Sequence, residues 1–336
     1  LYACRKFPGM LPYALFAVAV ILSVMGAAYF TVLAFLAPIT LLICEESKMD
    51  KLTGAVAINC GALAGGDFPT AALGVIFRGL MDSSYEAAPE LEAIDSFVTC
   101  LKMFGLAVLF SLILVTIFRF ALPANRNIGK DIKFEKPEAY TTAQKQTLYL
   151  MVAMMAVVLA FPLLKLLIPG NAVIKLVAGK IDVGLVAFVF AVIALLMKLA
   201  PQKEIIARVP WNTILMIAGA GMLIAVAVEA GTIDLLSNWI GSNVPTFLVP
   251  IAFSLVGAVM SPGLSATTGL GAANLFTCTV LGAQSSAISP FSSGGSLILG
   301  SCGNEEDRSS LFNRLLFVAT PISIGVAAIF NLIVSM

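Results

Sequence analysis

The sequence predicts an all-α polytopic membrane protein built from inverted repeats, each containing a re-entrant hairpin and a broken helix. The chain is 60% hydrophobic and only 12% charged, with a mean hydropathy of +1.00. A soluble domain carries about twice that charged fraction. The 70 residues from Leu235 to Asn304 contain no Asp, Glu, Lys or Arg, yet Ser, Thr, Gly and Pro clusters interrupt them. A similar order of segments occurs near both ends of the chain.

Two polar clusters break the uncharged run, at 261–269 (SPGLSATTG) and 289–295 (SPFSSGG). Hydrocarbon offers no hydrogen-bond partners, so unwound backbone at that depth must be buried in protein or line a wet cavity. Broken helices near the midplane are the usual construction of a secondary transporter's binding site. The chain has no His and no Cys spacing typical of a metal site, and its spans contain no acid pair, which argues against an intramembrane enzyme.

The first half begins with an uncharged run of 38 residues, Phe7 to Cys44. A span needs about 20 apolar residues, so this run suits a re-entrant hairpin turning at 26–28 (GAA), or two cramped spans. A broken helix with the motif GGDFPT at 65–70 follows. In chain order we expect a hairpin at 7–44, a charged loop at 45–51, a broken helix at 52–80, an acidic loop at 81–96 and a span at 97–118.

The second half is expected to repeat this order after two or three additional spans. The expected elements are spans at 147–168, 182–199 and 211–231, an interfacial helix at 232–240, a hairpin at 245–281, a second broken helix to Gly300, a charged loop at 302–308 and a last span at 311–336. We therefore divide the chain into a first repeat (1–118), a linker (119–146) and a second repeat (147–336). Since the first hairpin is preceded by only a few residues and the chain starts at Leu1, we expect spans upstream of this sequence.

The distribution of charged residues between the loops predicts how the chain is oriented in the membrane. The linker segment 119–145 holds six basic and three acidic residues, whereas 81–96 holds five acidic residues and no basic ones. Basic loops prefer the cytoplasm, so the linker is expected inside and the acidic loop outside. The two hairpins then enter from opposite faces, as an inverted repeat requires. The expected location is the cell (inner) membrane, crossed several times, with the lipid bilayer as partner; nothing indicates nucleic acid, and a homodimer is left open.

Three motifs resemble a known superfamily. VPWNTIL at 209–215 is similar to the start of the second repeat in divalent anion–sodium symporters. ISPFSSGGSL at 288–297 and NCGALAGGDFPT at 59–70 resemble the two broken helices of dicarboxylate carriers of the MatC type in the ion transporter superfamily. The resemblance implies an elevator-type permease that carries a small dicarboxylate, such as a C4-dicarboxylate or malonate, by symport. Neither hairpin tip has the Asn of that family's Ser-Asn-Thr element, so Na⁺ and H⁺ both stay open as coupling ions. No other cofactor is expected.

Substrate binding is assigned to the two tips and the two breaks. A helix N-terminus carries about half a positive charge and unpaired N–H groups, so two half-helices aimed at one point can bind an anion without Arg. Alternatively, the small residues serve close helix packing. The candidate residues are Gly26, Ala27, Ala28, Thr31, Gly65, Gly66, Pro69, Thr70, Ser265, Thr267, Thr268, Ser289, Pro290, Ser292, Ser293 and Gly294.

Asp67 and Asn59 are assigned to cation or proton coupling. Asp67 is the only acid between Lys51 and Asp82, and an ionisable residue inside the membrane is a functional candidate by default. It could instead cap the second half-helix. Arg78, near the outer end of that helix, is interpreted as a snorkelling side chain. The alternatives to a dicarboxylate carrier are a cation/proton antiporter of the same superfamily and a membrane protein without transport activity.

Overall fold

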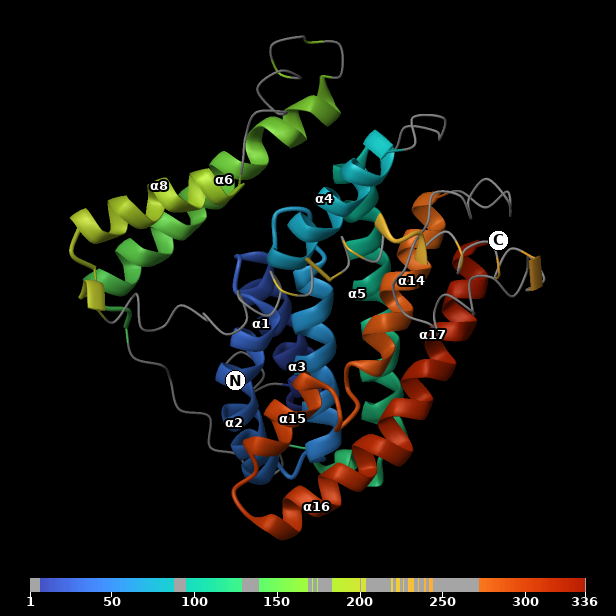
Figure 1. The fold of residues 1–336 in the computed structure, drawn as a ribbon. Helices are drawn as coiled ribbons and strands as arrows, with labels where there is room; N and C mark the ends of the chain where they lie inside the picture. The colour runs from blue at the N-terminus through green and yellow to red at the C-terminus, as the bar shows by residue number, and fades with distance from the viewer. Residues whose placement is uncertain are drawn as a thin grey trace. The chain divides into compact units, whose positions relative to one another are not determined.

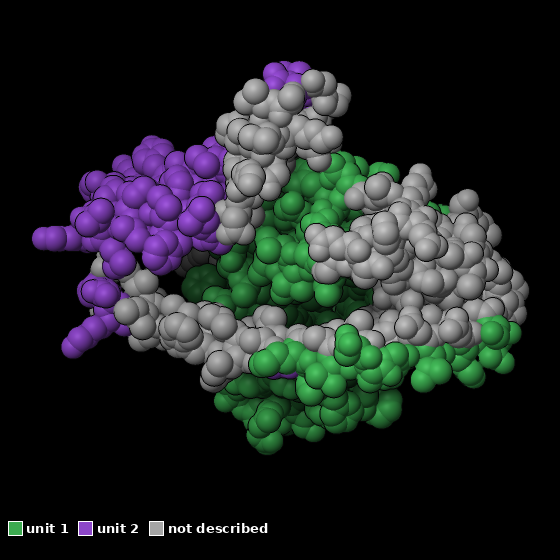
Figure 2. Space-filling view, turned by 45° about the horizontal axis from the view of Figure 1, so that its top comes forward, with its two compact units in different colours: residues 1–135, 220–336 green, residues 136–219 purple. Residues whose placement is uncertain are grey.

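The computed structural model describes residues 7–87, 95–128, 139–168, 183–199 and 272–335, with isolated residues between 171 and 243. All regular structure in these residues is helical, which confirms the all-α prediction for this part of the chain. Four described helices are long and apolar enough to cross a membrane, at Tyr29–Ser47, Ser96–Ala121, Thr142–Ala160 and Glu305–Val334. The chain divides into two compact units, Leu1–Glu135 with Ala220–Met336 and Lys136–Gly219 (Figure 2).

Helix α3 (Lys51–Gly66) is the central helix of the first unit (Figure 1). Every residue from Leu52 to Gly66 is buried, as expected for a helix that is surrounded on all sides. Helices α1 (Leu11–Val24), α2 (Tyr29–Ser47) and α5 (Ser96–Ala121) pack around it. This arrangement places the C-terminal end of α3, where the first break begins, inside a helical cluster.

Helices α1 and α2 form the first hairpin, and Gly26, with a φ of 100°, lies in its turn. This left-handed conformation favours glycine. At 1.5 Å per residue, the 14 residues of α1 reach about 21 Å, which is less than the ~30 Å hydrocarbon core. The expected turn is therefore present, and the length of α1 fits a re-entrant arm.

Both predicted helix breaks are present. Helix α3 ends at Gly66 and α4 (Ala72–Ala87) follows, while α14 (Ala272–Ser286) is separated from α15 (Ser293–Gly300). The first break starts later than the motif suggested, because α3 continues through Gly65 and Gly66.

Three segments that we expected as charged loops are partly helical. Helix α2 extends through Glu45 and Glu46 to Ser47. Helix α4 carries the first residues of the acidic segment and ends at Ala87. Helix α16 (Glu305–Arg314) begins directly after Asn304, whose side chain accepts a hydrogen bond from the backbone of Asp307. The sequence located the charges correctly but underestimated how far helices continue into them.

The last expected span is one helical element with an irregular turn. Helix α16 continues through a π-helical turn, Leu315–Ala319, into α17 (Thr320–Ser335). Pro321 offers no backbone N–H to the preceding turn, and the Thr320 hydroxyl donates to the Leu315 carbonyl at 2.8 Å. Helix α17 packs against α14 (Figure 1).

The second unit contains α6 (Thr142–Leu167) and α8 (Val183–Leu196), which contact each other. Helix α6 is long enough to cross a membrane and coincides with the span expected at 147–168, whereas α8 lies within the span expected at 182–199 but is a shorter apolar helix. Thr141 and Gln144 form a capping box at the start of α6. The span expected at 211–231, the interfacial helix at 232–240 and the second hairpin tip lie largely or wholly outside the described residues.

Candidate functional site: two matching helix breaks

The two breaks have the same backbone construction. In the first, Ala71 N–H donates to the Phe68 carbonyl at 2.8 Å; in the second, Ser292 N–H donates to the Ser289 carbonyl at 2.9 Å. Phe68 and Ser289 each precede a proline. Their own N–H groups donate back to the carbonyl three residues earlier, at 3.3 Å and 3.0 Å. The turn is thus repeated at corresponding positions in the two halves of the chain.

One glycine completes each turn. A Cβ atom at Gly74 would overlap the Phe68 carbonyl oxygen, and a Cβ atom at Gly295 would overlap the Ser289 carbonyl oxygen. Both glycines stand six residues after the carbonyl that they face. The obstacle is backbone in both cases, so any side chain would displace the turn.

The first hairpin tip contacts the second break. The Tyr29 hydroxyl, at the start of α2, donates to Asn59 Oδ1 at 2.6 Å. A Cβ atom at Gly294 would overlap that hydroxyl and lie 3.0 Å from Asn59 Oδ1. Asn59 is 1% exposed, and its Nδ2 has no hydrogen-bond partner among the described residues. We call Tyr29, Asn59 and Gly294 the tip cluster; it leaves one buried amide donor beside the start of α15.

The N-terminus of α15 is capped by Ser292, whose Oγ accepts from the Gly295 N–H at 3.0 Å. The same hydroxyl lies 2.6 Å from the Ala287 carbonyl oxygen and 2.7 Å from the Ser289 carbonyl oxygen. Such a cap is typically worth about 1 kcal/mol. Ala71, the corresponding residue before α4, has no side-chain acceptor, so the two half-helices start at similar turns but are capped differently.

Asp67 links the first break to the end of α14. Its side chain is 0% exposed, and both carboxylate oxygens accept from Gln284 Nε2, each at 2.7 Å. No cationic side chain in the described part of the chain forms an ion pair with it. A buried carboxylate without a counter-charge is strongly disfavoured, so this position suits a bound proton or a cation. Among the described residues the carboxylate accepts its side-chain hydrogen bonds from Gln284, and none is recorded from the first turn of α4, as the alternative interpretation of a cap would require.

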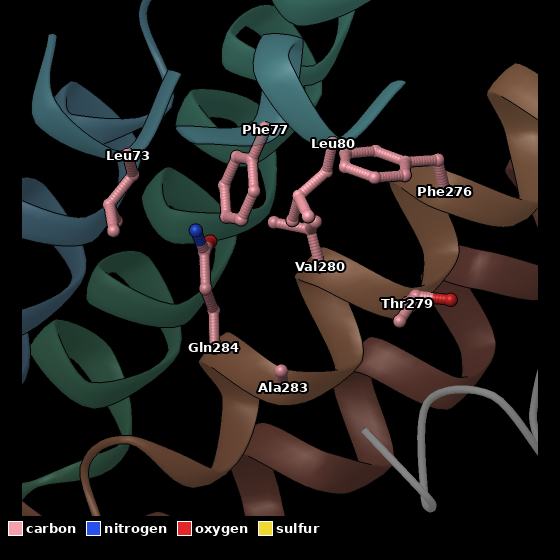
Figure 3. Close-up of a pocket in the computed structure, with 8 residues that line it drawn as sticks. All are labelled: Leu73, Phe77, Leu80, Phe276, Thr279, Val280, Ala283 and Gln284. Carbon is pink, nitrogen blue, oxygen red and sulfur yellow. The ribbon is translucent and has the colours of Figure 1, made fainter. Parts of the chain in front are cut away.

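A cavity of about 150 Å³ lies between α4 and α14, next to the Gln284 amide (Figure 3). Its lining is apolar except for Thr279 and Gln284. Sites for small organic ligands typically have about 300–1,000 Å³, so this cavity is too small and too apolar to hold an organic dianion.

The remaining predicted residues have diverse environments. Gly65 packs against α1, since a Cβ there would lie 2.5 Å from the Val20 carbonyl oxygen; the packing interpretation therefore holds for this glycine. Thr31 is exposed, while Thr70 is buried with an Oγ that has no partner among the described residues. Gly26, Ala27 and Ala28 lie in the turn, Gly66 ends α3, Pro69 and Pro290 lie in the breaks, Ser289 is half-buried, Ser293 is exposed, and Ser265, Thr267 and Thr268 lie outside the described residues.

Sequence reasoning did not single out Tyr29 or Gln284. Gln284 is the only Gln in the uncharged run from Leu235 to Asn304, and this isolation is the signal that could have identified it. Tyr29 lies in the predicted tip, but a tyrosine there is equally consistent with packing. Only the tertiary structure brings each residue to its partner.

Comparison with known proteins gives one finding. No curated protein matches the chain significantly. A family model described as CitMHS, citrate transporter, matches residues 1–293, which include the first hairpin and the break between α14 and α15. The match supports a membrane transporter of the ion transporter type, but it does not single out the MatC type. The chain belongs to the CitMHS family of citrate transporters.

Proposed function

We propose that this protein is a secondary active carrier for small organic anions with two or three carboxylates, coupled to the movement of an ion. The observation that carries the proposal is the pair of matching helix breaks, of which the second contacts the first hairpin tip. Interrupted helices in corresponding positions of two halves are the best pointer to a transporter's binding site. Family membership favours transport over a structural or enzymatic role.

The half-helices α4 and α15 supply the anion recognition in this proposal. Each begins at a break, so its N-terminal N–H groups and partial positive charge face the interrupted backbone. The unpartnered Asn59 Nδ2 adds a buried donor beside α15. C4-dicarboxylates, malonate and citrate all present carboxylates that such donors can bind.

Asp67 is the proposed coupling residue. Asp67 is buried, and Gln284 is its side-chain partner among the described residues, so either a proton or Na⁺ can supply the compensating charge. The bond to Gln284 connects the first break to α14, so the occupancy of Asp67 can influence both halves. The division of the chain fits an elevator mechanism, with Leu1–Glu135 and Ala220–Met336 carrying the substrate and Lys136–Gly219 belonging to the scaffold.

Counterflow in liposomes tests the proposal. The reconstituted protein should accumulate labelled citrate, succinate or malonate against the matching unlabelled anion inside, and a Na⁺ or proton gradient should raise the initial rate. Liposomes without protein are the control. If none of the three anions is exchanged above that control, the proposed function is wrong.

Cation/proton exchange is the second candidate. The observation that favours it is the buried carboxylate of Asp67, which forms no ion pair with a described residue. The two candidates differ in one measurement. An antiporter would exchange Na⁺ for protons in liposomes that contain no carboxylate, whereas a coupled anion carrier would not.

A further inference from the structure

Arg78 is a charged residue that the proposed mechanism does not use. It stands six residues after Ala72, the first residue of α4, which places its Cα about 9 Å beyond the break at 1.5 Å per residue. The hydrocarbon core extends only about 15 Å from its midplane. If the break lies near the midplane, as the proposed function requires, the guanidinium is held inside the membrane.

The side chain points back toward the break. Arg78 Nη1 donates to the Pro69 carbonyl at 3.4 Å, and the guanidinium carbon lies 5.5 Å from the centre of the Phe97 ring. Helical side chains ordinarily lean toward the N-terminus, whereas a snorkelling Arg must bend the other way to reach water. The snorkelling interpretation from the sequence is therefore wrong.

The charge of Arg78 has no anionic partner among the described residues. Asp82, one turn further along α4, is exposed and does not form an ion pair with it. Arg78 Nε is buried without a hydrogen-bond partner in the part of the chain that the structure describes. The Phe97 ring stabilises a cation, but its face does not replace the in-plane acceptors that a guanidinium can bind.

We propose that Arg78 recognises a carboxylate of the transported anion and favours substrates with a third negative charge. This inference rests on the proposed function, because the anion must approach the first break. A planar guanidinium binds a carboxylate through two parallel N–H···O bonds; Arg78 Nη1 contacts the Pro69 carbonyl in the break, and the described residues supply no partner for its Nε. The half-helix N-termini then hold the other carboxylates, so a tricarboxylate gains one charged contact that a dicarboxylate does not need.

The test compares Arg78→Gln with Arg78→Lys for citrate and succinate uptake into proteoliposomes. In Arg78→Gln the KM for citrate should rise about tenfold or more, as expected for the loss of a charge-assisted contact, while the KM for succinate should change by less than about threefold on the same reasoning. Arg78→Lys should retain part of the citrate preference, because it keeps the charge but not the bidentate geometry. Lys102→Gln, which removes an exposed cation from α5, should change neither KM.

Two results would overturn the inference. One is an unchanged citrate-to-succinate preference in Arg78→Gln. The other is an equal loss of Vmax for both anions at constant KM, which a merely structural role would produce. If the unsubstituted protein carries none of these anions, the proposed function itself fails; if it carries them and Arg78→Gln keeps the preference, only the role of Arg78 fails.

Discussion

Gly294→Ala tests whether the contact between the hairpin tip and the second break matters for transport. The added Cβ would overlap the Tyr29 hydroxyl and lie 3.0 Å from Asn59 Oδ1. Tyr29 is only 8% exposed, so its ring has little free space to move into. The hydroxyl must leave Asn59 or the start of α15 must shift.

Two contributions determine how much free energy the tip contact is expected to lose in Gly294→Ala. Loss of the 2.6 Å bond leaves the Asn59 side chain without any partner among the described residues, which costs about 1–3 kcal/mol. Overpacking a filled site adds about 1–3 kcal/mol. We therefore expect Gly294→Ala to weaken the tip contact by about 2–6 kcal/mol in total, with a lower melting temperature in detergent and a large loss of citrate or dicarboxylate uptake.

Gly300→Ala is the matched control. Gly300 ends the same helix, and nothing lies within 4 Å of a Cβ built there, so this variant should be neutral or slightly stabilising. Combining Gly294→Ala with Tyr29→Phe should restore part of the stability, because the overlapping hydroxyl is then absent. Equal melting temperatures and uptake rates for Gly294→Ala and Gly300→Ala would refute the reasoning.

Three further measurements address the breaks and the topology. Ser292→Ala should destabilise α15 by about 1 kcal/mol through loss of its N-cap and reduce uptake; an unchanged melting temperature and rate would contradict this. Asp67→Asn should abolish the dependence of uptake on the Na⁺ or proton gradient, because Asn neither ionises nor binds a coupling proton; an unchanged gradient dependence would exclude Asp67 as the coupling residue. The topology is tested by cysteine labelling after the native cysteines are replaced by Ser. An impermeant maleimide should label Glu46→Cys and Glu306→Cys from one side of the membrane and Asp82→Cys from the other. Labelling of all three from one side would refute the topology.

Local chemistry made the breaks and the first tip predictable. The motifs GGDFPT and SPFSSGG contain Pro, which lacks the backbone N–H of a regular helix, and Gly, which permits backbone to approach backbone. Both signals act within a few residues of the chain, so no tertiary information is needed to locate the turn. The prediction of the turn near Gly26 succeeded for the same reason.

The roles of individual residues were less predictable, because they depend on neighbours that are distant in sequence. Gly65 looks like part of the break but fits against the backbone of α1. Asp67 finds Gln284 more than two hundred residues away, and no local pattern specifies that pairing. Arg78 resembles a snorkelling residue by position alone; its actual direction appears only from its contact with Pro69.

Polar contacts in the first unit bring together three segments that the charge rule assigned to the same side of the membrane. Asp50, which caps α3 through a bond from the Leu52 N–H, also pairs with Arg314 at 2.8 Å and donates its own N–H to Asn125 Oδ1 at 2.9 Å. Lys51 pairs with Asp307 at 2.7 Å. These bonds join the segments near residues 50, 125 and 310, and the charge rule assigned all three to the cytoplasm. Since the first hairpin ends at Ser47, close to Asp50, its open end lies at the same end of the first unit as these contacts.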